Sequence, residues 1–164
     1  MPCYLFTYHT YGSWLPDRPQ GYVRRGEGVL PTDHDMADAY RQQMKQDAVL
    51  FDEQQQRVAI DAVLTTAEHI VASVHAIATE LTHLHLLTSW RDERPHDKVS
   101  TSFKRGVTIT LRRNCDEKKW LSRDHSRKRV EDREHFEYLI EEYLPNHSGW
   151  KWSESRGYFR SADV

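Results

Sequence analysis

The sequence predicts an α+β fold of the split βαβ, ferredoxin-like type, in which helices pack on an antiparallel sheet. Strand-like segments rich in aromatic and β-branched residues alternate with amphipathic helical segments, and two strand-like segments follow each other closely at 70–79 and 81–90. The order of strand, helix, strand, strand, helix and a further helix is typical of this fold. A chain of 164 residues fits one domain, which we expect to span residues 1–164.

The first part of the chain predicts one strand, one long loop and a helical region. Residues 4–11 favour a strand, while residues 16–31 contain Pro, Gly and Arg without periodicity and predict a loop. Residues 33–56 are polar and helix-favouring, which indicates one or two surface helices. Residues 57–69 predict an amphipathic helix. Its apolar stripe contains Ile60, Val63, Leu64, Ala67 and Val71.

The rest of the chain predicts two strands and two helices. Residues 70–79 and 81–90 are close enough to pair antiparallel, and Asp97 is suited to cap a helix that runs to Asn114. The apolar residues of this helix recur every four positions, at Val99, Phe103, Val107 and Leu111. A loop containing Trp120 precedes a last helix, at about 131–143, which Pro145 ends. The tail, about 145–164, predicts a short strand or an arm.

The composition excludes several classes of protein. No segment approaches the ~20 apolar residues of a membrane span, and the start lacks the features of a signal peptide, so we expect a cytoplasmic protein without membrane contact. Cys3 and Cys115 lie far apart without the spacing of a zinc site, and we interpret both as reduced thiols.

Positive charge is concentrated in one stretch. Residues 98–129 contain 11 basic residues against 3 acidic ones, whereas the whole chain has a net charge of -2. Such a local excess can bind phosphates, because neutralising them releases counterions. A solvated helix face is an equally good explanation on charge alone.

The segment ELTHLHLLTSW contains two histidines, His83 and His85, separated by one residue. Because alternate residues of a strand share a face, both imidazoles can approach one divalent ion, with a third ligand from elsewhere. The simpler interpretation is two partly buried histidines that bond to neighbouring groups. Spacing alone does not decide between them.

The predicted last helix carries Tyr138 and Glu142 four residues apart, on one face. A tyrosine can attack a phosphodiester covalently, although its pKa of ~10 requires a nearby cation or base. Tyr143, with His147 four residues further on, is a rival candidate, but Pro145 lies between the two. These aromatic residues can also be packing residues.

Taken in order, these motifs resemble a known family. His83-Leu84-His85 on a strand, a basic helix, a Trp-containing loop and a tyrosine helix are similar to the HUH single-tyrosine transposases, and most similar to the REP-associated tyrosine transposases. The stretches KRVEDREHFEYLIEEYLP and FTYHTYGSWLPDRPQGYV carry the likeness. It spans about residues 4–147, and about 16–56 would be an insertion relative to compact members.

The resemblance implies a metal-dependent transposase that nicks and joins single-stranded or hairpin DNA. Tyr138, or its rival Tyr143, would form a 5′-phosphotyrosine, and His83, His85 and Glu142 would bind Mg or Mn. Glu142 departs from the family, which usually has Gln or Asn there. The residues expected to contact DNA are Lys98, Lys104, Arg105, Arg112, Arg113, Lys118, Lys119, Trp120, Arg127, Lys128 and Arg129.

Several further points stay open on the sequence alone. Trp150 and Trp152 are additional candidates for stacking on bases, and Tyr4, Tyr8 and Trp14 suit either core packing or substrate contact. The protein would act as a monomer or homodimer, at the nucleoid when bound to DNA. A catalytically inactive nucleic-acid-binding protein is the main alternative. A phosphoesterase ranks last, because only one His-x-His motif is present.

Overall fold

The computed structural model describes residues 1–13, 15–24 and 26–161, so the role left open for Trp14 lies outside the described residues. The elements in chain order are β1 (Cys3–Thr10), β2 (Tyr22–Arg24), β3 (Gly28–Leu30), α1 (His34–Gln43), α2 (Glu53–Ile70), β4 (Ser73–Thr79), β5 (His83–Ser89), α3 (His96–Asn114), β6 (Leu121–Arg129), α4 (Arg133–Tyr138), the π-helical turn η1 (Leu139–Tyr143), β7 (Lys151–Ser153) and β8 (Gly157–Phe159).

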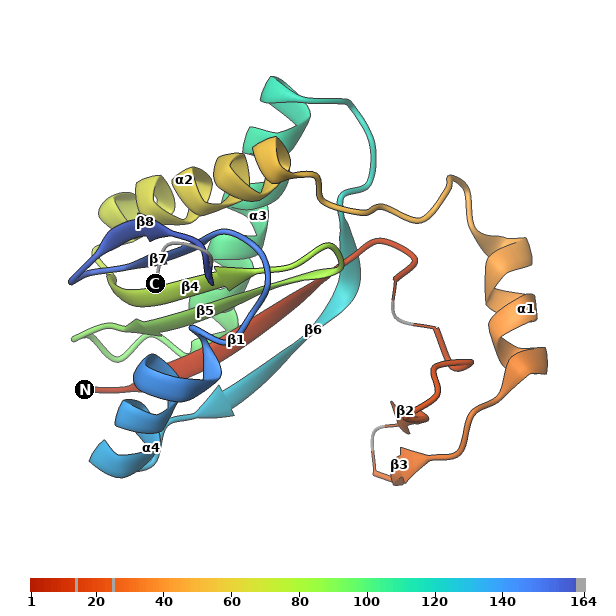
Figure 1. The fold of residues 1–164 in the computed structure, drawn as a ribbon, viewed down its shortest axis with the longest axis horizontal. Coiled ribbons are helices and arrows are strands. Elements are labelled where there is room, and N and C mark those ends of the chain that lie inside the picture. Colours follow the sequence, from red (N-terminus) through yellow and green to blue (C-terminus); the bar gives the residue numbers. More distant parts are fainter. Residues whose placement is uncertain (14, 25, 162–164) are drawn as a thin grey trace.

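The sheet has the predicted split βαβ topology. Its strand order is β6-β1-β5-β4-β7-β8, and every neighbouring pair runs antiparallel. The chain passes from β1 through α2 to β4, leaving room for β5 between the two strands, and from β5 through α3 to β6 on the far side of β1 (Figure 1). The α+β fold class is therefore confirmed.

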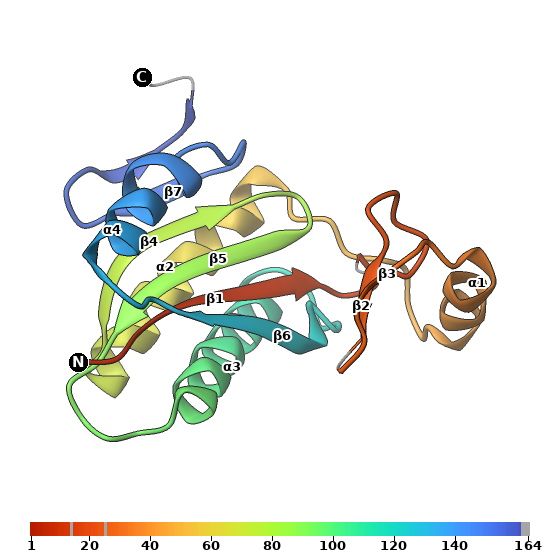
Figure 2. The same cartoon turned by 90° about the horizontal axis from the view of Figure 1, so that it is seen from below.

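The two faces of the sheet are covered differently (Figure 2). Helices α2 and α3 pack on one face, here called the helix face, where Leu84 and Leu86 of β5 join the main core. The other face, here called the histidine face, has a smaller apolar cluster. In that cluster Leu87 of β5 meets Leu139 and Leu144 of the C-terminal helical segment. The central strands β1, β4 and β5 therefore have side chains buried on both sides.

Helices α2 and α3 form where the sequence predicts them. The predicted stripe of α3 is buried throughout, and α2 begins with a capping box between Asp52 and Gln55. Val71 does not join the stripe of α2: it ends the helix with φ 55° and is 81% exposed. Asp97 lies in the first turn of α3 rather than at its cap, which is Pro95.

Two predicted loops contain strands. Within the expected loop, β2 and β3 form a small ribbon, which extends with α1 beyond one end of the sheet (Figure 1). Residues 121–129, expected as a loop, form the edge strand β6, because they pair with β1. The expected tail includes β7 and β8, which extend the opposite edge of the sheet.

Trp120 is a core residue rather than an exposed ring that can stack on a base. Its side chain is 0% exposed, stacks near Phe51, and donates from Nε1 to the carbonyl of Asp116 at 2.9 Å. The prediction that Trp120 contacts DNA is therefore wrong, because the ring would have to leave the core to reach a base.

No helix in the described ranges 1–13, 15–24 and 26–161 is long and apolar enough to cross a membrane.

We expect Trp120→Ala to lower the free energy of unfolding by about 3–5 kcal/mol, because it leaves a large cavity in the core. Ile109 lies on an exposed side of α3, so Ile109→Ala should change this free energy by no more than about 0.5 kcal/mol. Urea denaturation followed by circular dichroism measures both. Equal losses of stability would contradict the placement of Trp120 in the core.

Candidate metal and nucleophile site

The strand β5 brings the two predicted histidines together on the histidine face. His83 and His85 alternate with the buried Leu84 and Leu86, which fix the orientation of the strand. The imidazole centroids of His83 and His85 lie 4.7 Å apart. The prediction of a shared face is therefore confirmed.

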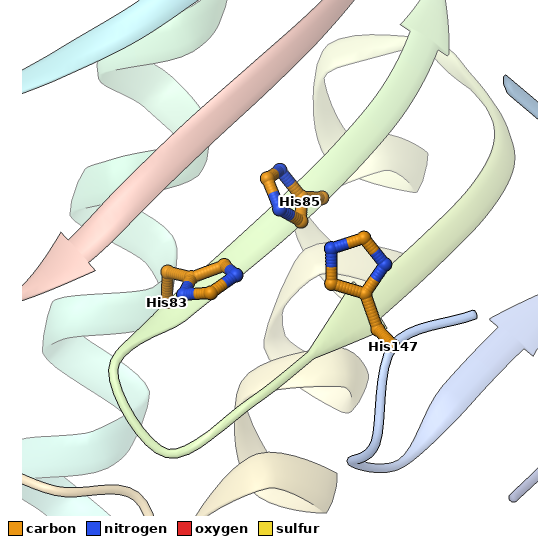
Figure 3. Close-up of side chains that lie close together, drawn as sticks. All are labelled: His83, His85 and His147. Atoms are coloured by element: carbon orange, nitrogen blue, oxygen red, sulfur yellow. The ribbon is translucent and has the colours of Figure 1, made fainter. Parts of the chain in front are cut away.

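A third imidazole, that of His147, completes the group (Figure 3). His147 follows η1 and the turn after it, and its ring lies 4.5 Å from the ring of His85 and 5.8 Å from that of His83, centroid to centroid. One nitrogen from each ring lies within 4.8 Å of the other two. The three residues can therefore hold a divalent metal ion between them.

Hydrogen bonds on the outer side of these rings hold them in position. His147 Nδ1 lies 2.9 Å from the carbonyl oxygen of Tyr143, and since a carbonyl only accepts, Nδ1 carries the hydrogen. This leaves the Nε2 lone pair of neutral His147 available to a metal. Nδ1 of His85 lies 2.7 Å from the hydroxyl of Thr7. Nδ1 of His83 lies 3.0 Å from the hydroxyl of Thr82. Such partners orient metal-binding histidines.

The surroundings keep two of the imidazoles neutral. Burial, and then the neighbouring His83, His147 and His9, lower the pKa of His85 to about 2. Burial also lowers the pKa of His83, although the nearby Glu80 opposes this shift. Because metals bind the neutral imidazole, these shifts leave His83 and His85 in the form that can bind a metal ion near neutral pH.

A π-helical turn sets the position of the two tyrosines. The amide of Leu144 donates to the carbonyl of Leu139 at 3.0 Å, a bond across five residues instead of four. This brings Tyr138 and Tyr143, five apart, to a centroid separation of 6.3 Å. Sequence spacing alone predicts an α-helix here, which would instead align Tyr138 with Glu142.

Tyr143 is the tyrosine nearer to the imidazoles. Its ring centroid lies 5.4 Å from that of His85 and 5.0 Å from that of His147, and the ring is partly buried. Tyr138 is 49% exposed and lines a smaller pocket together with Glu142, Tyr143 and His147. Burial, followed by Tyr138 and Glu80, raises the pKa of Tyr143, so its phenol is protonated near neutral pH.

The carboxylate beside the imidazoles is not the expected one. Glu142 is exposed and does not belong to the three-imidazole group. Glu80, in the turn before β5, instead places Oε2 3.6 Å from Nε2 of His83. Sequence analysis missed both Glu80 and the contact of His147 with the pair. The spacing of four from Tyr143 to His147 was the available signal for the latter.

A buried lysine supports the turn that carries His147. Lys151 is 1% exposed, and its Nζ donates to the carbonyls of His147 at 2.6 Å and Gly149 at 3.0 Å. It also donates to the hydroxyl of Ser161 at 3.0 Å. These bonds satisfy a charge that would otherwise be costly to bury. They fix the backbone of the turn directly behind the imidazole.

The three imidazoles open onto a pocket of about 560 Å³ on the histidine face. Tyr143 borders one side of it, and Ser126 of β6 another. Ser13, which follows β1, and Arg18, at the start of the insertion, also line it. The pocket can admit a phosphodiester next to the candidate metal position.

Most of the basic residues expected to contact DNA lie away from this pocket. Five of them are on α3, which packs on the helix face, and Lys118 and Lys119 precede β6. Arg127 and Arg129 pair in register with Phe6 and Tyr4, whose rings pack into the helix-face core. Lys128 pairs with Leu5 and shares the histidine face.

Comparisons of the sequence with protein-family models and with curated proteins find no match. Among solved structures, a REP-associated tyrosine transposase bound to a REP hairpin superimposes with a TM-score of 0.51 at 10% identity, over 88% of this chain. This chain spans 64% of the length of that protein. A Deinococcus radiodurans protein provisionally described as a transposase gives a TM-score of 0.48 at 12% identity, over 90% of this chain and 92% of its own.

The first of these likenesses shows that the chain has the fold of that REP-associated tyrosine transposase. At 10% identity it establishes the fold and leaves the activity to be argued from the site.

We expect His147→Ala to weaken Mn²⁺ binding by at least ~100-fold, because loss of a ligand costs more than loss of a ligand's hydrogen-bond partner. Glu142→Ala should retain the affinity of the unsubstituted protein. Isothermal titration calorimetry measures both, with circular dichroism to verify folding. The opposite result, with binding lost only in Glu142→Ala, would restore Glu142 as the third ligand.

Proposed function

We propose that this protein is a metal-dependent enzyme that nicks and joins single-stranded DNA through a covalent tyrosine intermediate, as a transposase does. The observation that carries the proposal is the contact of the Tyr143 ring with two of three imidazoles that can hold one metal ion. A nucleophile beside a metal position is the arrangement that phosphodiester transfer requires.

The fold adds support for DNA as the substrate. The solved structure with the similar fold is a transposase bound to a REP hairpin, and the motifs of this sequence resemble the same family. We therefore propose single-stranded or hairpin DNA as the substrate class, with the protein acting as a monomer or homodimer in the cytoplasm. The imidazoles and Tyr143 line the same pocket of about 560 Å³, so a substrate phosphate in it would lie beside both.

The donor set favours one of the two ions that the family resemblance implies. Imidazole nitrogens suit divalent transition ions, whereas Mg²⁺ prefers oxygen ligands and keeps several waters. His83, His85 and His147 would therefore hold Mn²⁺ more readily than Mg²⁺. We propose Mn²⁺ as the working ion, with Mg²⁺ as the weaker substitute.

Tyr143 is our proposed nucleophile, in preference to Tyr138. The ring of Tyr143 adjoins the imidazoles, while Tyr138 lies beyond it and is half exposed. Tyr143 also precedes His147 by four residues, the spacing that the resemblance implies between nucleophile and third ligand. Tyr138 remains the rival on sequence grounds.

The reaction follows from these positions. The bound ion would polarise a non-bridging phosphate oxygen and stabilise the negative charge of the transition state. Tyr143 Oη then forms a bond to phosphorus as the bond to the 3′ oxygen breaks, the phenol proton is lost, and the 3′ oxygen gains a proton. The new phosphotyrosine retains the energy of the ester, so a 3′-OH can attack it and rejoin the strand without ATP.

Tyr143→Phe should abolish formation of a protein–DNA adduct, because phenylalanine keeps the ring but has no oxygen to attack phosphorus. The assay incubates labelled single-stranded hairpin DNA with the protein and Mn²⁺ and detects labelled protein on a denaturing gel. Tyr138→Phe is the matched control and should retain the adduct.

Each other result has a definite meaning. An adduct lost only in Tyr138→Phe would keep the proposed activity and move the nucleophile. DNA binding without an adduct in any variant, across a varied hairpin pool, would replace the proposal with the non-catalytic DNA-binding protein.

A further inference from the structure

A site that binds DNA needs positive charge near its pocket, and most of the predicted basic residues lie elsewhere. The expected DNA-contacting residues of α3 lie across the sheet from the pocket that holds the imidazoles. Among the described residues that line this pocket, Arg18 is the one with a permanent positive charge. It comes from the insertion rather than from the predicted basic stretch.

The backbone of Arg18 is fixed in a tight turn. Its carbonyl oxygen accepts hydrogen bonds from the amide of Gly21 at 2.9 Å and from the hydroxyl of Thr32 at 2.6 Å. Two residues earlier, the carbonyl oxygen of Pro16 accepts a hydrogen bond from the amide of Asp33 at 2.9 Å. The side chain of Arg18 therefore projects from an anchored point.

The chain between β1 and the insertion also lies close to the imidazole group. Gly12, at φ +75°, turns the chain after β1, and a Cβ there would lie 2.4 Å from Cε of Met44. The hydroxyl of Ser13 then donates to the carbonyl of Thr10 at 2.7 Å and lies 3.3 Å from that of Thr82, the residue before His83. The segment therefore runs beside the candidate metal ligands.

The local charges are consistent with an anion between Arg18 and the imidazoles. Asp17, the acidic neighbour of Arg18, forms an ion pair with Arg41 of α1. His9, whose ring centroid lies 6.0 Å from that of His83, lines the same pocket as Arg18. Glu80 is the acidic residue in the described lining, and it lies beside His83.

We propose that Arg18 binds a backbone phosphate of the DNA strand, opposite the imidazole group and adjacent to the phosphate that reacts. This assignment rests on the proposed function and deepens it by naming a substrate-binding residue. The planar guanidinium can donate two parallel hydrogen bonds to one phosphate, which fixes the strand as well as attracting it. The insertion then supplies a positive charge at the pocket, which the basic residues of α3 cannot do because they lie on the other face of the sheet.

The test compares three variants by their binding of a short single-stranded DNA at several salt concentrations. Arg18→Gln removes the charge, Arg18→Lys keeps the charge without the paired donors, and Arg24→Gln is the matched control. Arg24 belongs to the same insertion, on β2, and is exposed beside Glu27. Calorimetry with Mn²⁺ alone verifies that each variant keeps its metal site.

We expect Arg18→Gln to reduce the slope of log K against log salt by about 0.7, the value for one phosphate of a single strand. Its adduct formation with Mn²⁺ should slow about 10-fold, with unchanged Mn²⁺ affinity. Arg18→Lys should keep most of the salt slope but not the full rate. Arg24→Gln should match the unsubstituted protein.

The outcomes separate this inference from the proposed function. If the unsubstituted protein forms the adduct and Arg18→Gln behaves like Arg24→Gln in slope and rate, Arg18 is not a phosphate ligand although the function stands. If no protein forms an adduct but Arg18→Gln still loses salt slope, the phosphate site stands without catalysis. Absence of any DNA binding would overturn both.

Discussion

The alternation of side chains along β5 is the constraint on which the site depends. Leu84 and Leu86 are buried against α2 and α3, so the strand cannot rotate or slip by one residue without moving leucines into the pocket and imidazoles into the core. Burial of the leucines therefore also fixes the direction of His83 and His85. The same packing that stabilises the sheet orients two candidate metal ligands.

The position of the third candidate ligand, His147, depends on the path of the chain after α4. The π-helical turn shifts the phase of the helix by one residue and brings Tyr143 against His85, and the following turn brings His147 over the same ring. The buried Nζ of Lys151 stabilises the backbone of that turn by donating hydrogen bonds to the carbonyls of His147 and Gly149. A strand and a turn more than sixty residues apart thus form one group of three imidazoles.

The distribution of charge separates two surfaces. Most of the basic stretch lies on α3 and on the α3 side of β6, behind the sheet, while the pocket contains neutral imidazoles and Arg18 from the insertion. Arg18 lines the pocket beside the imidazoles, so the start of the insertion borders the candidate site.

By itself the sequence determined the fold class, the order of the core elements β1, α2, β4, β5 and α3, the buried stripe of α3 and the shared face of His83 and His85. It could do so because hydrophobic periodicity and strand alternation are local properties. It did not determine that residues 121–129 pair as an edge strand or that Trp120 enters the core, since both depend on contacts distant in the chain. Of the candidate site, the sequence predicted the pair His83 and His85 but not the residues that pack against them. Tyr143 and His147, rather than Tyr138 and Glu142, lie against the imidazoles because a π-turn changes the helix phase, and only the packed tertiary structure decides such a turn.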